Sequence, residues 1–211
     1  MTGNDLEYVR NLLSKGLIEG PVLELGGGYG GMTCREIVES SGLTYQSTDI
    51  VAGSGVDFVA DFEAEDCGRS FAQHRYGCVL VLNVLEHVFE PIKVLDNAIS
   101  LLRHEGKVVT ITPCMWPIHS YPIDCQRLLP DWFISYAERR KDVQLLDSVF
   151  EFVGYGPISA FANGLEAQLP SPWRTVFGQR YSRLVHKLFN TAGRGQWAAS
   201  HVAVGAAFAK R

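Results

Sequence analysis

The sequence predicts an α/β protein in which a largely parallel sheet is covered by helices on both faces. Up to about residue 112, segments of strand character alternate with segments of helical character, as in a doubly covered parallel sheet. The run at residues 77–83 is apolar throughout, which is typical of a strand buried on both faces. A glycine-packed turn at residues 26–31 directly follows the apolar segment at 22–25, as in ligand-binding sheets of this class.

Local signals set the limits of the regular part. Asn4 or Asp5 is predicted to cap the first helix, and Gly42 to close the second. Pro91 suits the first turn of a later helix, and Gly106 suits the residue just after its end. In chain order we expect a helix at 5–17, strands at 22–25, 43–49, 57–61, 77–83 and 107–112, and helices at 30–41, 66–74 and 91–102.

The remainder of the chain is less regular. A loop at 113–130 precedes a predicted helix at 131–141 and a strand-like run at 143–153. Residues 154–172 have no clear period, and they are followed by a predicted helix at 173–189 and a final strand at 200–209. We therefore expect a single domain over residues 1–211, with residues 154–199 as a lid or cap insertion before the last strand.

Composition excludes several classes of protein. The chain has 211 residues, of which 46% are hydrophobic and 20% charged, as in ordinary globular proteins. No apolar run is long enough to span a bilayer, and the N-terminus lacks the basic and apolar regions of a signal peptide, so we expect a cytoplasmic protein. The five cysteines contain no C-x-x-C pair, which favours reduced thiols over a disulfide or zinc framework.

Charge is distributed unevenly along the chain. All 23 acidic residues lie at or before Glu166, whereas seven of the 19 basic residues follow it. Arg180, Arg183 and Lys187 fall on one face of the predicted helix at 173–189. This face could be solvated, or it could bind an anionic acceptor, a membrane surface or a partner subunit, as in a homodimer. Nucleic acid is disfavoured as a partner, because no basic stripe is interleaved with exposed aromatic residues.

The glycine turn is compatible with more than one cofactor. Gly26, Gly28 and Gly31 fit the G-x-G-x-x-G pattern of dinucleotide-binding folds, although a tight turn without any ligand is also possible. Glu24 stands two positions before the first glycine. A carboxylate there would repel a pyrophosphate but would hold an ammonium group, which favours a cationic ligand.

Further candidates follow the second and third predicted strands. Asp49 ends the second strand, where a carboxylate can accept both ribose hydroxyls of a nucleotide. Asp61 and Phe62 end the third strand and offer an acceptor for an adenine amino group and an aromatic face to stack on it. The alternative for both aspartates is a turn role at the end of a strand.

Two motifs together resemble a known family. Glu24, Gly26, Gly28 and Gly30 match E-x-G-x-G-x-G, which resembles motif I of the class I S-adenosylmethionine (SAM) methyltransferases. Residues 83–88, Asn-Val-Leu-Glu-His-Val, resemble the N-x-L-E-H-V stretch of the type 11-like members. The resemblance covers roughly residues 20–130 and makes a nicotinamide dehydrogenase unfavourable.

The resemblance implies a Rossmann-like sheet of seven strands, six parallel and the last antiparallel. SAM would lie over the carboxyl ends of strands one to four, and cofactor roles would fall to Glu24, Gly26, Gly28, Asp49, Asp61 and Asn83. His87 in the second motif is a candidate base, or it could position the acceptor or seal the site. We expect the loop at 113–130 to receive the acceptor, since it follows the fifth strand at the same edge of the sheet.

Within that loop, residues 119–127 resemble the H-x-Y-P-x-D-x-x-R segment of some methyltransferases of polysaccharide and natural-product pathways. His119, oriented by Asp124, is the first candidate for the base. Alternatively, Asp124 and Arg127 only pair to hold the loop, and His119 is a surface residue.

The sequence constrains the identity of the acceptor and the need for a metal ion least. Three aromatic residues could stack on a sugar ring: Trp116, Tyr121 and Trp132. Four side chains could bind Mg²⁺ if their loops converge: Glu86, His87, His119 and Asp124.

We expect O-methylation of a hydroxyl on a small polar acceptor, with a saccharide preferred, as in actinobacterial enzymes that methylate polysaccharides. The alternatives are a natural-product hydroxyl or carboxylate as acceptor, and a SAM-binding partner protein without turnover.

Overall fold

The computed structural model describes residues 1–28, 32–65, 67, 71, 75–116, 118–120, 122–153, 156–159, 166–167 and 202–211. Its helices are α1 (Gly3–Ser14), α2 (Arg35–Ser40), α3 (Pro91–Ser100) and α4 (Pro130–Arg139), with single 3₁₀ turns η2 (Leu85–His87) and η3 (Asp147–Val149). The strands are β1 (Val22–Leu25), β2 (Tyr45–Asp49), β3 (Phe58–Val59), β4 (Tyr76–Leu82), β5 (Leu102–Met115), β6 (Val143–Leu145), β7 (Glu151–Val153), β8 (Gly156–Ser159), β9 (Glu166–Ala167) and β10 (Val202–Lys210).

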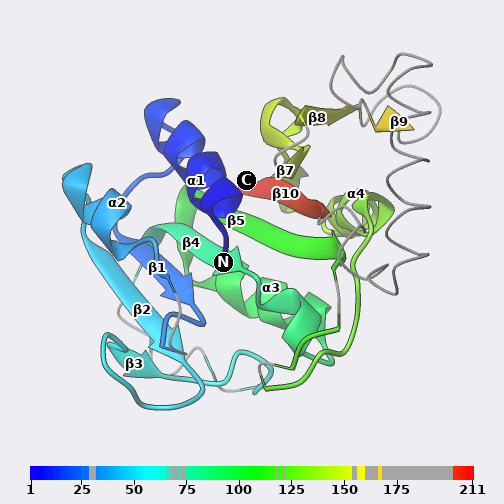
Figure 1. Ribbon diagram of the computed structural model, residues 1–211. Helices are drawn as coiled ribbons and strands as arrows, with labels where there is room; N and C mark the ends of the chain where they lie inside the picture. The colour runs from blue at the N-terminus through cyan, green and yellow to red at the C-terminus, as the bar shows by residue number, and fades with distance from the viewer. Residues whose placement is uncertain are drawn as a thin grey trace.

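The sheet has the predicted Rossmann-like plan (Figure 1). Its order is β3-β2-β1-β4-β5-β10-β7-β8-β9, and the pairs from β3 to β5 are all parallel. The last strand, β10, runs antiparallel to β5. Both β6 and β7 pair with the other edge of β10, so the predicted strand-like run at 143–153 is one strand position interrupted by η3. Together with β8 and β9, this interruption takes the described strands beyond the expected seven.

Alternate residues of the central strands enter two separate core layers. Leu23, Val79 and Val81 pack in the layer that α3 and α4 cover. Cys78 and Leu80 pack in the layer on the opposite face, which α1 and α2 cover. All seven residues of β4 are buried, which confirms the strand predicted from the apolar run.

The helix ends agree with the sequence in part. Pro91 is the first residue of α3, and Gly42, with a φ of +77°, follows the end of α2, both as predicted. The cap of α1 is Thr2 rather than Asn4 or Asp5. The Thr2 hydroxyl accepts from the Asp5 N–H, and the Asp5 carboxylate accepts from the Thr2 N–H, which makes a capping box.

β5 is longer than the predicted strand at 107–112. Gly106 lies inside it rather than after a helix, and a Cβ at this position would come within 3.0 Å of the Tyr76 carbonyl oxygen. Pro113 does not stop the strand, because it lies opposite Ala203 beside a shift in the register. Such an irregularity accommodates a proline that cannot donate to the ladder.

Several predictions fall outside the described residues. The predicted helix at 66–74 is described only at Cys67 and Phe71, and the predicted helix at 173–189, with its basic face, is not described. Of the predicted insertion at 154–199, the structure describes β8 and β9. None of the helices in the described part of the chain is long and apolar enough to cross a membrane.

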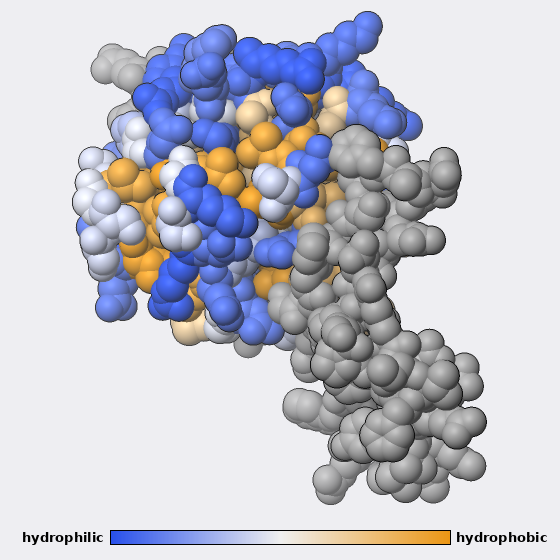
Figure 2. Space-filling model, turned by 90° about the horizontal axis from the view of Figure 1, so that it is seen from above, coloured by the Kyte–Doolittle hydropathy of each residue, from blue (hydrophilic) through white to orange (hydrophobic). Residues whose placement is uncertain are grey.

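Apolar side chains also reach the surface. Figure 2 shows an apolar band that crosses the face seen from above and is bordered by hydrophilic residues. Two large apolar side chains stand out in the segments after β4 and β5, Phe89 at 76% and Ile118 at 89% exposure. Phe89 follows His87 by two residues, and Ile118 directly precedes His119. Exposed apolar side chains therefore neighbour the two candidate histidines along the chain.

We predict that Gly205→Ala lowers the free energy of unfolding by about 1–3 kcal/mol through overpacking. A Cβ on Gly205 in β10 would lie 2.7 Å from Cζ of Tyr8 and 3.0 Å from Cγ2 of Val153. Tyr8 is held in place by its hydroxyl, which donates to the Val149 carbonyl over 2.7 Å. Urea titration followed by circular dichroism measures the change.

The matched control is Gly3→Ala, because a Cβ there meets nothing within 4 Å. Since Gly3 opens α1, alanine should leave stability unchanged or raise it by up to about 1 kcal/mol. Equal stability of Gly205→Ala and the wild-type chain would contradict the close packing of α1 on β10.

Candidate active site

The carboxyl ends of the parallel strands bring most of the predicted site residues to one edge of the sheet (Figure 1). The glycine turn follows β1, Asp49 ends β2, and Asn83 directly follows β4. The acceptor loop follows β5 at the same edge. The sheet therefore assembles cofactor and acceptor candidates that are up to about 100 residues apart in the sequence.

The glycine turn packs against the end of β2. The N–H groups of Gly26 and Gly27 donate to the Thr48 carbonyl over 2.8 and 3.2 Å, and the N–H of Gly28 donates to Asp49 Oδ2 over 3.0 Å. Gly26 has a φ of +74°, which favours glycine. A Cβ at Gly28 would overlap the Val56 side chain and lie 3.2 Å from Asp49. The described glycines are thus required by the turn itself; residues 29–31 lie outside the described part.

Glu24 is engaged inside the protein. Its side chain is 2% exposed, and Oε2 accepts from the Cys34 N–H over 2.8 Å and from the Tyr45 hydroxyl over 2.7 Å. Burial raises the pKa of the carboxyl, against these hydrogen bonds, which lower it. Glu24 thereby fastens β1 to β2 and to the start of α2. Its predicted contact with an ammonium group stays a prediction.

Asp49 is buried at the mouth of the glycine turn. Besides the bond from Gly28 to Oδ2, its Oδ1 accepts from the Val51 N–H over 3.2 Å. A carboxylate oxygen has two acceptor sites, so each oxygen of Asp49 retains capacity for a ribose hydroxyl. These hydrogen bonds thus orient the Asp49 carboxylate and leave acceptor capacity on both of its oxygens.

Asp61 and Phe62 differ in burial. Asp61 is exposed, and its Oδ1 accepts from the Glu63 N–H over 2.8 Å in a turn. Phe62 is 6% exposed and packs in the core, with its ring centroid 5.7 Å from that of Phe71. The ring of Phe62 therefore serves the core, and its predicted stacking on adenine stays a prediction.

Asn83 connects the site to the N-terminal helix. It has a φ of 54°, and its Nδ2 donates over 3.1 Å to the Asp5 Oδ2. The same buried carboxylate accepts from the Thr2 N–H at the start of α1. Asp5 is a site residue that our sequence interpretation missed. The T-x-x-D capping pattern signals Asp5 as a helix residue, but no local signal reveals its contact with Asn83.

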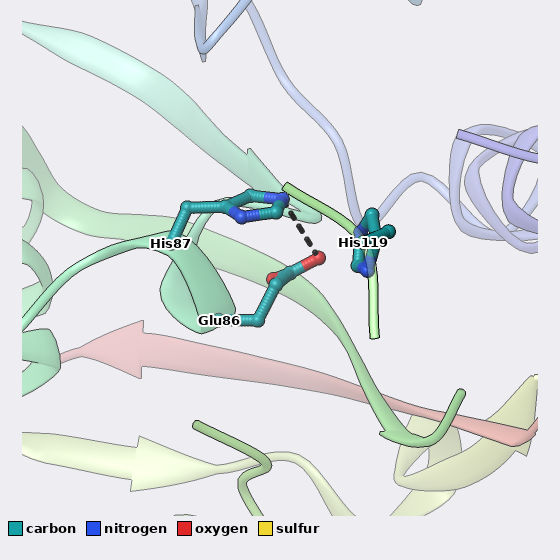
Figure 3. A group of neighbouring side chains, drawn as sticks. All are labelled: Glu86, His87 and His119. Carbon is teal, nitrogen blue, oxygen red and sulfur yellow. Dashed lines mark ion pairs between the residues drawn. The ribbon is translucent and has the colours of Figure 1, made fainter. Parts of the chain in front are cut away.

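Three further candidates converge at the start of the acceptor loop (Figure 3). Glu86 Oε1 lies 3.6 Å from His87 Nε2, and the rings of His87 and His119 meet edge to face with centroids 4.9 Å apart. Figure 3 shows the Glu86 carboxyl group directed between the two imidazoles. The structure thus brings Glu86, His87 and His119 together, three of the four side chains whose loops had to converge for a metal site.

The environment of this group shifts its acid–base properties. Glu86 is fully buried, and within the described part of the chain neither of its carboxyl oxygens accepts a hydrogen bond. Burial raises the pKa of Glu86 to about 8. Burial also lowers the pKa of His87, so its imidazole is neutral at pH 7. A protonated carboxyl beside a neutral imidazole therefore lines this part of the site.

Asp124 holds the acceptor loop in place. It forms a two-pronged ion pair with Arg127, with Nη2 to Oδ2 at 2.7 Å, and its Oδ2 accepts from the His119 N–H over 2.8 Å. The hydrogen bond from Arg127 is the main reason why the pKa of Asp124 is well below its usual range. His119 Nδ1 lies 3.4 Å from Asp124 Oδ2. Asp124 therefore braces the loop and also neighbours the His119 ring.

The loop is fastened to η2 by further contacts that the sequence did not reveal. The N–H groups of Cys125 and Gln126 donate to the Glu86 carbonyl over 2.8 and 3.3 Å. The Gln126 side-chain amide donates to the carbonyls of Leu85 and Val88 over 3.0 and 2.7 Å. Gln126 thus fixes the loop to the segment that carries Glu86 and His87.

The aromatic candidates are separated by the fold. The Trp116 ring lies 6.4 Å from that of His119, near the site. Trp132 stacks on Tyr136 at 5.5 Å along α4. Tyr121 lies outside the described residues. Of the three, Trp116 is the one that the described structure brings close to His119.

The side chains expected for Mg²⁺ do not form an oxygen-rich set. Asp124 is engaged by Arg127, and the remaining group has two imidazoles and one carboxyl: Glu86, His87 and His119. Mg²⁺ prefers oxygen ligands in octahedral geometry. These residues therefore do not support the predicted Mg²⁺ site.

Comparisons with known proteins place this geometry in a family. Residues 7–154 match the model of a family described as a methyltransferase domain. A SAM-dependent methyltransferase from Archaeoglobus fulgidus is 15% identical over 99% of this chain and 95% of its own, with a TM-score of 0.56. A comparison with curated proteins gave no match.

Other similar structures differ in the reaction that their names give. The 1,6-didemethyltoxoflavin N1-methyltransferase of Burkholderia thailandensis, with 1,6-didemethyltoxoflavin and S-adenosylhomocysteine bound, is 13% identical over 97% of this chain and 77% of its own, with a TM-score of 0.59. The [4+2]-cyclase SpnF is 13% identical over 96% and 80%, with a TM-score of 0.53. At these identities the likeness shows the SAM-dependent methyltransferase fold, and the acceptor must be inferred from the site.

We predict that metal-free protein loses stability as the pH rises from about 5 to 8 because of Glu86. A glutamate carboxyl in water has an ordinary pKa of 4.5, whereas that of Glu86 in the folded chain is about 8, so unfolding releases a proton within this window. The loss in the free energy of unfolding is on the order of a few kcal/mol, and it ends above pH 8. Urea titrations at several pH values with a chelator present measure it.

The control is Glu86→Gln, which keeps the shape of the side chain and cannot titrate. Its free energy of unfolding should lack this part of the pH dependence. Parallel curves for the wild-type chain and the variant would contradict the assignment.

Proposed function

Because this chain belongs to the methyltransferase domain family, we propose that it transfers a methyl group from SAM to a hydroxyl of a small polar acceptor, with a saccharide as the preferred class. The observation that carries this proposal is the position of the acceptor loop. Contacts of Asp124, Gln126 and Arg127 hold His119 against His87 and Glu86, beside the end of β4. Titratable groups therefore gather where an acceptor would approach the cofactor edge.

The described residues fit SAM as a nucleotide-type ligand. Asp49 keeps acceptor capacity for ribose hydroxyls, and exposed Asp61 keeps an oxygen for an adenine amino group. Asn83 stands at the end of β4 with its backbone in the left-handed region, between the glycine turn and the acceptor loop. SAM would supply a methyl group on a positively charged sulfur, so that an acceptor oxygen can displace the sulfur.

The two histidines are suited to a hydroxyl acceptor. The lowered pKa of His87 keeps its imidazole able to accept a proton at pH 7. His119 is partly exposed, and its Nδ1 lies 3.4 Å from the Asp124 Oδ2. We assign His119 as the base and His87 as the residue that positions the acceptor, with Asp124 orienting His119. Trp116 beside His119 supplies an aromatic face for a sugar ring.

A natural-product hydroxyl or carboxylate is the second candidate acceptor. The exposed side chains of Phe89 and Ile118 favour it, because they offer apolar surface in the segments that carry the two histidines. A sugar would use Trp116 but would have little use for these apolar groups.

We predict that the chain binds SAM and its demethylated product, and that Asp49→Ala weakens this binding tenfold or more. The variant removes the carboxylate assigned to the ribose hydroxyls and the acceptor for the Gly28 N–H. Isothermal titration calorimetry measures the affinity. The control is Glu138→Ala, an exposed acidic residue on α4 that should leave it unchanged. Tight binding of NAD without binding of SAM would refute the proposal.

We predict that His119→Ala lowers turnover by about 10²–10⁴-fold while the affinity for SAM stays within about twofold. The assay is a methyl-transfer screen over sugars and small phenols with wild-type protein, repeated with the variant on the best acceptor. Unchanged turnover would remove His119 from the role of base. SAM binding without transfer to any acceptor would favour a SAM-binding partner protein instead.

A further inference from the structure

Glu86, His87 and His119 form a cluster of metal-ligand types. Each residue offers one ligand atom, and the three atoms lie within 4.8 Å of one another. Two of the residues come from η2 and the third from the acceptor loop, so the cluster exists only in the folded chain (Figure 3). We propose that these three residues bind one divalent transition-metal ion of the Zn²⁺ class.

The state of Glu86 points independently to a ligand. Its side chain is 0% exposed, and both carboxyl oxygens lack a hydrogen-bond partner in the described part of the chain. Burying a polar group without a partner is costly, and natural proteins rarely leave one so. The carboxyl group is directed between His87 and His119 (Figure 3). A cation held between these side chains would supply the missing interaction.

The donor atoms select the kind of cation. Two imidazole nitrogens and one carboxylate oxygen suit Zn²⁺ and related transition ions, whereas Mg²⁺ prefers oxygen ligands alone. The nearby Asp124 would add an oxygen, but Arg127 and the His119 N–H already engage it. Three protein ligands with one position left open are typical of zinc sites that also bind water or substrate.

The surroundings orient the ligands as metal sites require. His87 Nδ1 is in hydrogen-bond contact with the Ile123 carbonyl, which fixes a proton on Nδ1 and leaves the lone pair of Nε2 for the ion. Nε2 is also the atom nearest Glu86, at 3.6 Å from Oε1. His119 Nδ1 lies 3.4 Å from the Asp124 Oδ2, which also accepts from the His119 backbone N–H. A carbonyl or carboxylate behind each histidine is a common feature of metal-binding imidazoles.

The distances allow binding after a small contraction. Ligand atoms lie about 2.0–2.2 Å from Zn²⁺, so two of them can be at most about 4.4 Å apart. The pair formed by His87 Nε2 and Glu86 Oε1 already meets this limit. Since all three atoms lie within 4.8 Å of one another, adjustments of side-chain torsions would complete the site.

The role of the ion in catalysis rests on the proposed function. With the ion bound, the acceptor hydroxyl could occupy the open coordination position. The ion would lower the pKa of this hydroxyl, and its proton would pass to water. His119 would then act as a ligand instead of accepting that proton. The binding site itself stands on geometry alone and does not depend on methyl transfer.

The test is direct metal binding by the full chain without SAM or acceptor. Protein stripped with a chelator is titrated with Zn²⁺ and with Co²⁺, using calorimetry and the visible spectrum of bound Co²⁺. We expect one ion per chain and an affinity at least tenfold weaker in Glu86→Gln. The matched control is His104→Ala, which removes an exposed histidine near the start of β5, at the other end of the strand from the acceptor loop, and should bind as the wild-type chain does.

Circular dichroism verifies that the variants fold, and His119→Ala, in a loop, replaces Glu86→Gln if the latter does not. No binding, equal binding in the folded ligand variants, or a preference for Mg²⁺ would overturn the inference. Metal binding without methyl transfer would refute the proposed function and support the site. Methyl transfer at full rate by metal-free protein would overturn the catalytic role of the ion.

Discussion

The parallel pairing of β4 with β1 on one side and β5 on the other determines where every candidate residue lies. All of β4 is buried, so its register is fixed by packing against helices on both faces. At its carboxyl end the chain turns sharply through Asn83 into η2, which carries Glu86 and His87. The glycine turn after β1 and the acceptor loop after β5 then flank this one point. A slip of β4 by one residue would disperse the site.

Polar contacts fasten the acceptor loop at this point, while Leu128 near its end packs in the core. Backbone N–H groups at Cys125 and Gln126 donate to the Glu86 carbonyl, and the Gln126 side chain satisfies two more carbonyls of the same segment. The ion pair of Asp124 with Arg127 closes the loop on itself. The hydrogen bonds of Cys125 and Gln126 each satisfy a backbone group of these segments. The position of His119 is therefore set by the hydrogen bonds that fasten its loop.

Local sequence patterns predicted the elements of secondary structure that depend on neighbouring residues alone. The alternation of elements indicated the sheet, the apolar run indicated β4, and Pro91 indicated the start of α3. The same patterns failed to predict features that depend on contacts between residues far apart in the sequence. Gly106 lies inside β5 because the strand pairs back to Tyr76, and no local signal carries that pairing.

The same limit holds for the site. Motifs predicted which residues gather at the sheet edge, and the structure brings His119 to His87. Motifs did not predict that Glu24 is engaged by Cys34 and Tyr45, that Phe62 packs in the core, or that Asp5 reaches Asn83. Sequence spacing identifies the strand end on which a side chain sits, whereas its hydrogen-bond partner depends on the packing of other elements.

Two carboxyl groups in neighbouring segments show how the fold distributes charge at the site. Asp124 has Arg127 as a partner and stays ionised, while fully buried Glu86 has no such partner among the described residues, and burial raises its pKa to about 8. The Arg127 guanidinium donates to Asp124, so it neutralises the carboxylate that braces the loop rather than the buried Glu86 carboxyl. A bound cation would therefore stabilise the ionised form of Glu86 more than that of Asp124. The burial of Glu86 beside two imidazoles thus favours a cation held among these three side chains.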